Sequence, residues 1–195
     1  MSKIRAIETR YAGYRFRSRL EARWAVFFDK MNTAYEYEVE GYQLKDGLYY
    51  LPDFILVDKR LHKKIVEIKP NGYPDEEARV KASLLCLQGY DTFDRIIIIT
   101  GDPVYVFENS SKSQEIVAYS WYFEKHDLEY SEQERDALSK INPNKISAEG
   151  VAKFWPLTGF DLCFQLFLNG GRYEEIMNAA RAARSARFEF GETGR

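Results

Sequence analysis

The chain has 195 residues, which suits one domain with a small appendage, and 45% of them are hydrophobic, which is enough for a packed core. Its formal net charge of −2 disfavours a tight non-specific binder of nucleic acid or of an anionic membrane surface. A nuclease is still compatible with this charge, because bound metal ions and local basic patches can offset phosphates. The first thirty residues contain eight basic residues and only three acidic ones. This asymmetry is typical of a one-sided nucleic-acid footprint, and equally of a solvated basic face.

The cysteines and histidines indicate neither an iron–sulphur cluster nor a zinc site. Cys86 and Cys163 are far apart and form no CxxC motif, and His62 and His126 have no metal-ligand spacing. We also find no signal peptide and no apolar stretch of membrane-spanning length. We therefore expect a cytoplasmic protein with no membrane partner.

The first predicted element is an amphipathic helix over residues 18–31, where apolar side chains recur at helical spacing. Ser18 followed by Glu21 forms a capping-box signature at its start. Three extended runs then follow, at residues 35–39, 49–57 and 64–69, separated by turns that contain glycine or charged residues. Pro52 predicts that the second of these runs lies at a sheet edge or contains a bulge.

A second helix is predicted over residues 74–88, followed by a strand over residues 95–100. The strand contains four consecutive isoleucines, which is typical of a strand buried on both faces. The remaining predicted elements are strands at 104–108 and 116–123, a helix start at Ser131 and Glu134, a buried helix at 158–168 and a closing helix at 173–188. The sequence therefore predicts an α/β fold, with a core over residues 1–125 and a helical C-terminal region over residues 126–195 that packs on it.

Asp53, Glu67 and Lys69 are charged residues within or at the end of apolar runs. Charges in such places are costly unless they are paired or liganded. A hairpin with its turn at residues 58–63 brings the three together, and Glu67 and Lys69 share a face because strand side chains alternate. Two carboxylates can hold a partly hydrated Mg²⁺, with the backbone carbonyl of Ile68 as a further ligand. Such a metal ion can activate water for the hydrolysis of a phosphodiester, and Lys69 would then contact the attacking water or the scissile phosphate.

Glu21 is the candidate for a third carboxylate at this site. The alternative is that Glu21 only closes the capping box with Ser18, which requires no metal. The two roles are compatible, because the first helix can pack over the sheet with Glu21 facing the hairpin.

The motifs Pro52-Asp53 and Glu67-Ile68-Lys69 resemble the PD-(D/E)xK motif of a nuclease superfamily. The segment from Phe16 to Ala22 resembles the first-helix glutamate motif of its members, and the resemblance covers roughly residues 11–108. It implies a core of helix, three strands, helix and strand, with a mixed sheet flanked by helices. The sequence Tyr-Leu-Pro-Asp-Phe around Asp53 resembles that of small nucleases of bacteriophage and mobile-element genomes.

This resemblance implies a Mg²⁺-dependent endonuclease that hydrolyses DNA phosphodiester bonds, with Mn²⁺ substituting, in the cytoplasm of a bacterial or phage-infected cell. Asp53, Glu67, Lys69 and Glu21 would be its catalytic residues. RNA is not excluded as a substrate, and a homodimer or a partner protein stays open. Two alternatives remain: a nucleic-acid-binding module that does not cleave, and a nuclease subunit active only within a larger transposition or phage complex.

Several residues are candidates for binding the nucleic acid. Arg17, Arg19 and Arg23 on the first helix and Lys81 on the second can reach phosphates, and Tyr14 can stack on an unpaired base. For each of them, ordinary surface packing or helix salt bridging is an equally good interpretation.

Overall fold

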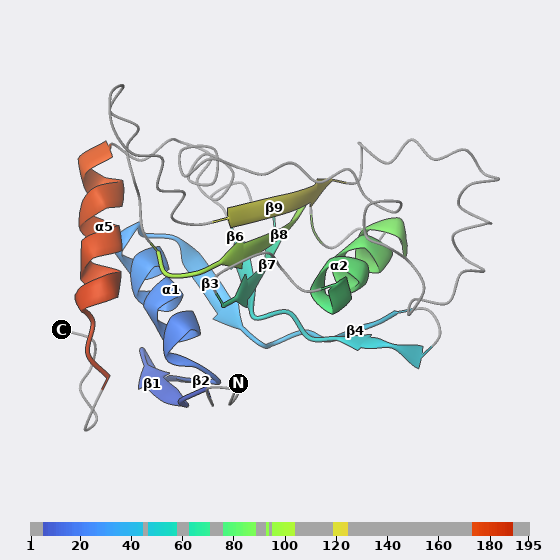
Figure 1. Ribbon diagram of the computed structural model, residues 1–195, viewed down its shortest axis with the longest axis horizontal. Helices are drawn as coiled ribbons and strands as arrows, with labels where there is room; N and C mark the ends of the chain where they lie inside the picture. Colours follow the sequence, from blue (N-terminus) through green and yellow to red (C-terminus); the bar gives the residue numbers. More distant parts are fainter. Residues whose placement is uncertain are drawn as a thin grey trace.

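The computed structural model describes residues 6–44, 47–57, 63–70, 76–88, 93, 95–103, 119–124 and 173–188. Within them, the central element is a mixed five-stranded sheet with the strand order β3-β6-β7-β8-β9 (Figure 1). The only parallel pair in this sheet is β7 with β8. The strands are β3 (Ala34–Tyr37), β6 (Phe54–Val57), β7 (Lys63–Lys69), β8 (Arg95–Thr100) and β9 (Tyr119–Glu124). The predicted α/β class is confirmed.

One face of the sheet is covered by α1 (Arg19–Lys30), which packs against α5 (Tyr173–Ser185) (Figure 1). Ser18 is the N-cap of α1, as predicted, and its side chain accepts a hydrogen bond from the Glu21 N–H. The buried side of α1 is aromatic, whereas α5 offers small residues, so the two helices approach closely. The hydrophobic cluster on this face includes Trp24, Phe28, Phe54, Val66, Ile97, Ala179 and Ala183.

The other face is covered by α2 (Glu76–Gln88), which lies between β7 and β8 in the chain. A parallel pair needs such a crossover, and a helix is its usual form. Ile96 and Ile98 belong to the hydrophobic cluster on this side, whereas Ile97 and Ile99 belong to the cluster beneath α1. All four isoleucines are fully buried. The prediction of a strand buried on both faces is confirmed.

The run over residues 49–57 is not one strand. It forms β5 (Tyr49–Tyr50), which pairs with β4 (Tyr42–Gln43), and then β6, with Pro52 between them. Since β6 lies between β3 and β7, the prediction of an edge strand is wrong. Pro52 has no N–H for the ladder, so β6 begins after it.

The sequence also did not reveal a hairpin of β1 (Thr9–Tyr11) and β2 (Tyr14–Phe16). Its two turn residues, Ala12 and Gly13, have φ angles of 49° and 86°. Positive φ at both central positions is typical of the tight hairpin turn that follows strand twist. The turn was not predicted because its first position holds Ala12, whereas glycine, asparagine or aspartate is usual there.

The closing helix is confirmed as α5, and the strand predicted at residues 116–123 as β9. The predictions for residues 104–108, for Ser131 and Glu134, for residues 158–168 and for the boundary near residue 125 lie outside the described residues, as do His62, His126 and Cys163. Among the helices that the structure describes, none is long and apolar enough to cross a membrane.

Candidate functional site

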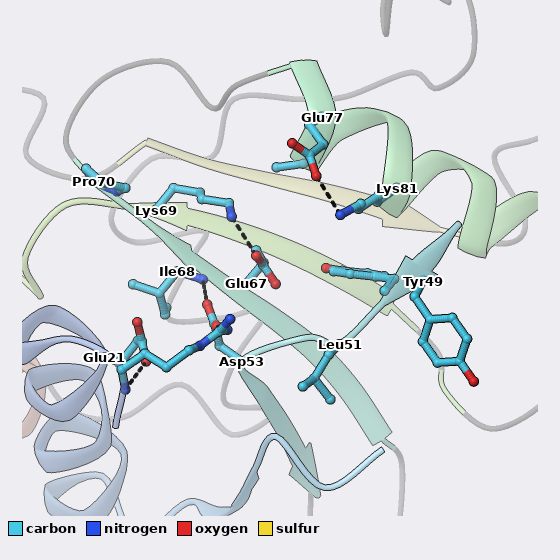
Figure 2. Close-up of a pocket in the computed structure, with 13 residues that line it drawn as sticks. Glu21, Tyr49, Leu51, Asp53, Glu67, Ile68, Lys69, Pro70, Glu77 and Lys81 are labelled. Carbon is cyan, nitrogen blue, oxygen red and sulfur yellow. Dashed lines mark hydrogen bonds and ion pairs between the residues drawn. The ribbon is translucent and has the colours of Figure 1, made fainter. Parts of the chain in front are cut away.

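A pocket of about 500 Å³ lies where the start of β6, the end of β7, the N-terminal end of α1 and the first turns of α2 meet (Figure 2). It brings together all four predicted catalytic residues, although they come from three elements of the fold. The lining residues are Arg17, Glu21, Tyr49, Tyr50, Leu51, Asp53, Glu67, Ile68, Lys69, Pro70, Glu77, Ala78 and Lys81.

Asp53 is the most buried charged residue of the pocket, with 2% of its surface exposed. Its Oδ2 accepts a hydrogen bond of 2.6 Å from the Ile68 N–H, and its Oδ1 accepts one of 2.6 Å from Arg17 Nη2. Burial raises the pKa of Asp53 well above its usual range, and the nearby charges of Glu67 and Glu21 raise it further. The two hydrogen-bond donors offset this rise only in part. The Asp53 carboxylate is therefore in an environment that favours additional positive charge.

Glu67 lies beside Asp53 because of the register of the β6–β7 pair. Phe54 is opposite Val66 in this antiparallel pair, and one step further along it Asp53 is opposite Glu67. Lys69 Nζ is 2.7 Å from Glu67 Oε1. Glu67 Oε2 is buried and has no hydrogen-bond partner among the described residues. A buried carboxylate oxygen without a partner is costly, and a bound cation would satisfy it.

Glu21 closes the cap of α1. Its Oε1 accepts a hydrogen bond of 2.6 Å from Ser18 Oγ, and its Oε2 accepts one from the Arg17 N–H and one from the Tyr37 hydroxyl. The capping interpretation is therefore confirmed by geometry. The same side chain also lines the pocket, so a role toward a metal stays a prediction.

Arg17 joins the pocket to a residue that the sequence did not reveal, Glu38. Arg17 Nε is 2.5 Å from Glu38 Oε1, and Arg17 Nη2 is 2.6 Å from Asp53 Oδ1. Burial lowers the pKa of Arg17. The charges of Asp53 and Glu38 and a hydrogen bond with Tyr37 raise it by more, so the pKa of Arg17 lies above its usual value. Burial also raises the pKa of the Glu38 carboxyl, against the opposing effect of Arg17.

The backbone of Glu38 is unusual. Its φ angle is 48°, in the left-handed region, and its N–H donates a 3.0 Å hydrogen bond to the carbonyl of Asp53. A non-glycine residue with this conformation is strained, and such strain is concentrated at functional sites. This left-handed conformation turns the chain just after β3, so that Glu38 lies next to Arg17. No local sequence signal announces it.

The predicted nucleic-acid contacts fall into two groups. Arg17 and Lys81 line the pocket, and Lys81 Nζ is 2.6 Å from Glu77 Oε1 (Figure 2). Arg19 and Arg23 are not among the lining residues, and Arg23 Nη1 is bound to Asp102 at 2.7 Å.

Tyr14 is also outside the pocket, because its ring packs on the rings of Phe16, Tyr35 and Tyr37. Two large hydrophobic residues line the pocket and are exposed: Tyr49 has 66% of its surface exposed, and Leu51 has 41%. The sequence alone does not show which aromatic residues lie at the pocket rim and which lie in the core.

The donor set of the pocket fits a hard divalent cation. Its lining includes carboxylates but neither cysteine nor histidine. No group of three or more metal-binding side chains is assembled among the described residues, so the candidate donors are Asp53, Glu67 and the Ile68 carbonyl. Mg²⁺ is commonly held by one or two carboxylates and keeps several waters, so such a small set is sufficient for it.

Comparisons of this chain with protein-family models, with curated proteins and with solved structures find no match.

Proposed function

We propose that this chain is a divalent-metal-dependent endonuclease that hydrolyses DNA phosphodiester bonds on a core of the PD-(D/E)xK type. The observation that carries the proposal is the arrangement of Asp53, Glu67 and Lys69 in one pocket, with Glu67 Oε2 buried and unpartnered among the described residues. When the separate two-stranded sheet of β4 and β5 is left aside, the elements follow in the order α1, β3, β6, β7, α2, β8. This order supports the proposal, because it follows the helix, three strands, helix and strand of that superfamily.

In this proposal, Asp53 and Glu67 hold a Mg²⁺ ion together with the carbonyl of Ile68. When bound, the metal supplies an activated water and neutralises charge on the phosphate. Asp53 is fixed for this role by the Ile68 N–H, which holds one of its oxygens in place. Lys69 orients Glu67 through its ion pair and directs a positive charge toward the scissile phosphate. Glu21 caps α1 and adds negative charge beside the metal donors.

The cations of the pocket support a phosphate-containing substrate. Arg17, Lys69 and Lys81 line the same cavity as the carboxylates. Contacts of such residues with phosphates fix the position of a nucleic acid without reading its sequence. Each of these three cations is paired with a carboxylate of the pocket, so a bound metal ion would have to offset the carboxylate charge before a phosphate binds.

The test is conversion of supercoiled plasmid to nicked or linear forms with Mg²⁺, Mn²⁺ or EDTA. We expect cleavage with either metal and none with EDTA, and a loss of about a hundredfold or more in Asp53→Asn. The matched control is Asp102→Asn, which removes a carboxylate that is also paired with an arginine but is not among the residues lining the pocket. It should cleave like the wild type.

Retention of cleavage by Asp53→Asn would contradict the proposal. DNA binding without cleavage under every metal condition would favour the non-cleaving module. Mn²⁺ binding that depends on Asp53, in a chain inactive by itself, would favour the subunit of a larger complex.

A further inference from the structure

The side chain of Arg17 bridges a buried carboxylate and the pocket rim. Asp53, at one end of the guanidinium, has 3% of its side chain exposed, whereas Glu38, at the other end, has 21% and Arg17 itself has 56%. The guanidinium therefore lies partly in solvent while it neutralises Asp53. The carboxylate of Asp53 accepts two hydrogen bonds from described residues: the donor at Ile68 is a backbone N–H, and the donor at Arg17 is a side chain able to rotate.

The main chain of Arg17 is fixed independently of this side chain. Its N–H donates to Glu21 Oε2 at 3.1 Å and to the Tyr37 hydroxyl at 3.0 Å, and the next residue is the N-cap of α1. The guanidinium can consequently leave Asp53 without loosening the start of the helix. Its Nε contact with Glu38 keeps it near the pocket when it does.

We propose that Arg17 and a divalent cation compete for the Asp53 carboxylate, so that metal binding releases the guanidinium to contact the nucleic-acid phosphate. This inference rests on the metal site of the proposed function. The physical reason is repulsion. A divalent cation bound to Asp53 would repel a guanidinium at hydrogen-bond distance from Oδ1, and because Asp53 is buried, little water lies there to screen this repulsion. Arg17 is thus a substrate-binding residue that becomes available to the phosphate only after the metal is bound.

The first test is the Mn²⁺ dissociation constant, measured by titration calorimetry on the wild type and the variants at one fixed pH. We expect Arg17→Met to bind Mn²⁺ about tenfold more tightly than the wild type, the size of effect expected when one competing hydrogen bond between charged groups is removed. Arg23→Met is the matched control, because Arg23 has its own carboxylate partner, Asp102, and does not line the pocket. Its Mn²⁺ affinity should equal that of the wild type.

The second test follows from linkage, because coupling between two ligands is reciprocal. With Ca²⁺ as the probe cation, Arg17→Met should bind a short DNA duplex about tenfold more weakly than the wild type, with a salt dependence reduced by about one phosphate contact. With EDTA, the two proteins should bind the duplex equally, because Arg17 is then engaged by Asp53. Arg17→Lys, which keeps the charge but loses the forked geometry, should give intermediate values in both tests.

Unchanged or weaker Mn²⁺ binding in Arg17→Met, with normal binding by the wild type, would overturn this inference and leave the metal site intact. An equal loss of DNA affinity with and without Ca²⁺ would also overturn it, since Arg17 would then be an ordinary phosphate contact. If neither protein binds Mn²⁺, the proposed function and the inference both fail. If Arg17→Met does not fold, the Mn²⁺ affinity of Arg17→Lys decides.

Discussion

Replacing Glu21 separates its structural role from any role toward a metal. In the structure its two oxygens accept hydrogen bonds from the Ser18 hydroxyl, the Arg17 N–H and the Tyr37 hydroxyl. Glu21→Ala would leave all three donors without this acceptor. Tyr37 is buried and cannot turn to water, whereas Ser18 is half-buried and can.

An unsatisfied buried donor costs about 1–3 kcal/mol, and a donor that recovers water costs less. We therefore expect Glu21→Ala to lower the free energy of unfolding by about 2–4 kcal/mol. For a chain of this size, 1 kcal/mol corresponds to about 2–4 °C in Tm, so the midpoint should fall by about 4–16 °C. Glu21→Gln keeps one acceptor oxygen and the side-chain length, and should lose only about 1 kcal/mol.

The assay is urea unfolding followed by circular dichroism, with Mn²⁺ affinity measured on the same proteins. The Arg17 N–H also donates to the Tyr37 hydroxyl, so the expected loss comes mainly from the Tyr37 and Ser18 hydroxyls. A loss below about 1 kcal/mol in Glu21→Ala would refute the account of the cap, because these two donors would then have other partners. Since both oxygens already accept hydrogen bonds, Glu21→Gln should weaken Mn²⁺ binding by about tenfold or less, the effect of removing a nearby charge. A larger loss would identify Glu21 as a direct ligand.

Three further predictions concern the pocket. The raised pKa of Asp53 means that its contribution to stability is full below the usual pKa of about 3.8 and is lost as pH rises through the raised value. Asp53→Asn should therefore gain stability relative to the wild type as pH rises above about 4 in urea titrations, and a relative loss would contradict the sign. Lys81→Met should weaken duplex DNA binding by about 1 kcal/mol and flatten its salt dependence, while thermal unfolding changes little because its pair with Glu77 is near the surface. Tyr49→Ala should weaken binding of single-stranded DNA by about 1–3 kcal/mol and Tyr49→Phe should not, as measured by fluorescence anisotropy; equal losses in both would exclude stacking.

The elements that the sequence predicted correctly are those with strong local signals. Ser18 and Glu21 marked the start of α1, and the isoleucine run marked β8, because a capping box and a fully apolar strand are each defined within a few residues. The proximity of Asp53 and Glu67 was also predictable. A hairpin with a short turn restricts its register, and side-chain alternation then sets which residues share a face.

The parts that were missed depend on contacts between residues far apart in the chain. Arg17 and Asp53 are 36 positions apart, and nothing near either residue indicates that they pair. The same is true of Arg23 and Asp102, so a residue considered for phosphate binding lies in an ion pair between α1 and the end of β8. The sequence left open whether Tyr14 stacks on a base or packs in the protein, and the structure shows it packed on other aromatic rings. In a chain with 14 tyrosines and 13 phenylalanines, composition does not distinguish a core aromatic residue from one at a binding surface.

The charge arrangement itself argues for a ligand rather than for a purely structural cluster. Carboxylates from three elements line one pocket, and burial and mutual repulsion raise the pKa of Asp53 in spite of Arg17. For the fold alone, an apolar residue at Asp53 would be as good or better, since replacing buried ion pairs by hydrophobic residues is often stabilising. Real proteins keep such locally unfavourable groups mainly where function requires them. Arg17 and Lys69 each pair with one of these carboxylates, yet Glu67 Oε2 is buried and has no hydrogen-bond partner among the described residues. A divalent cation would supply the further positive charge.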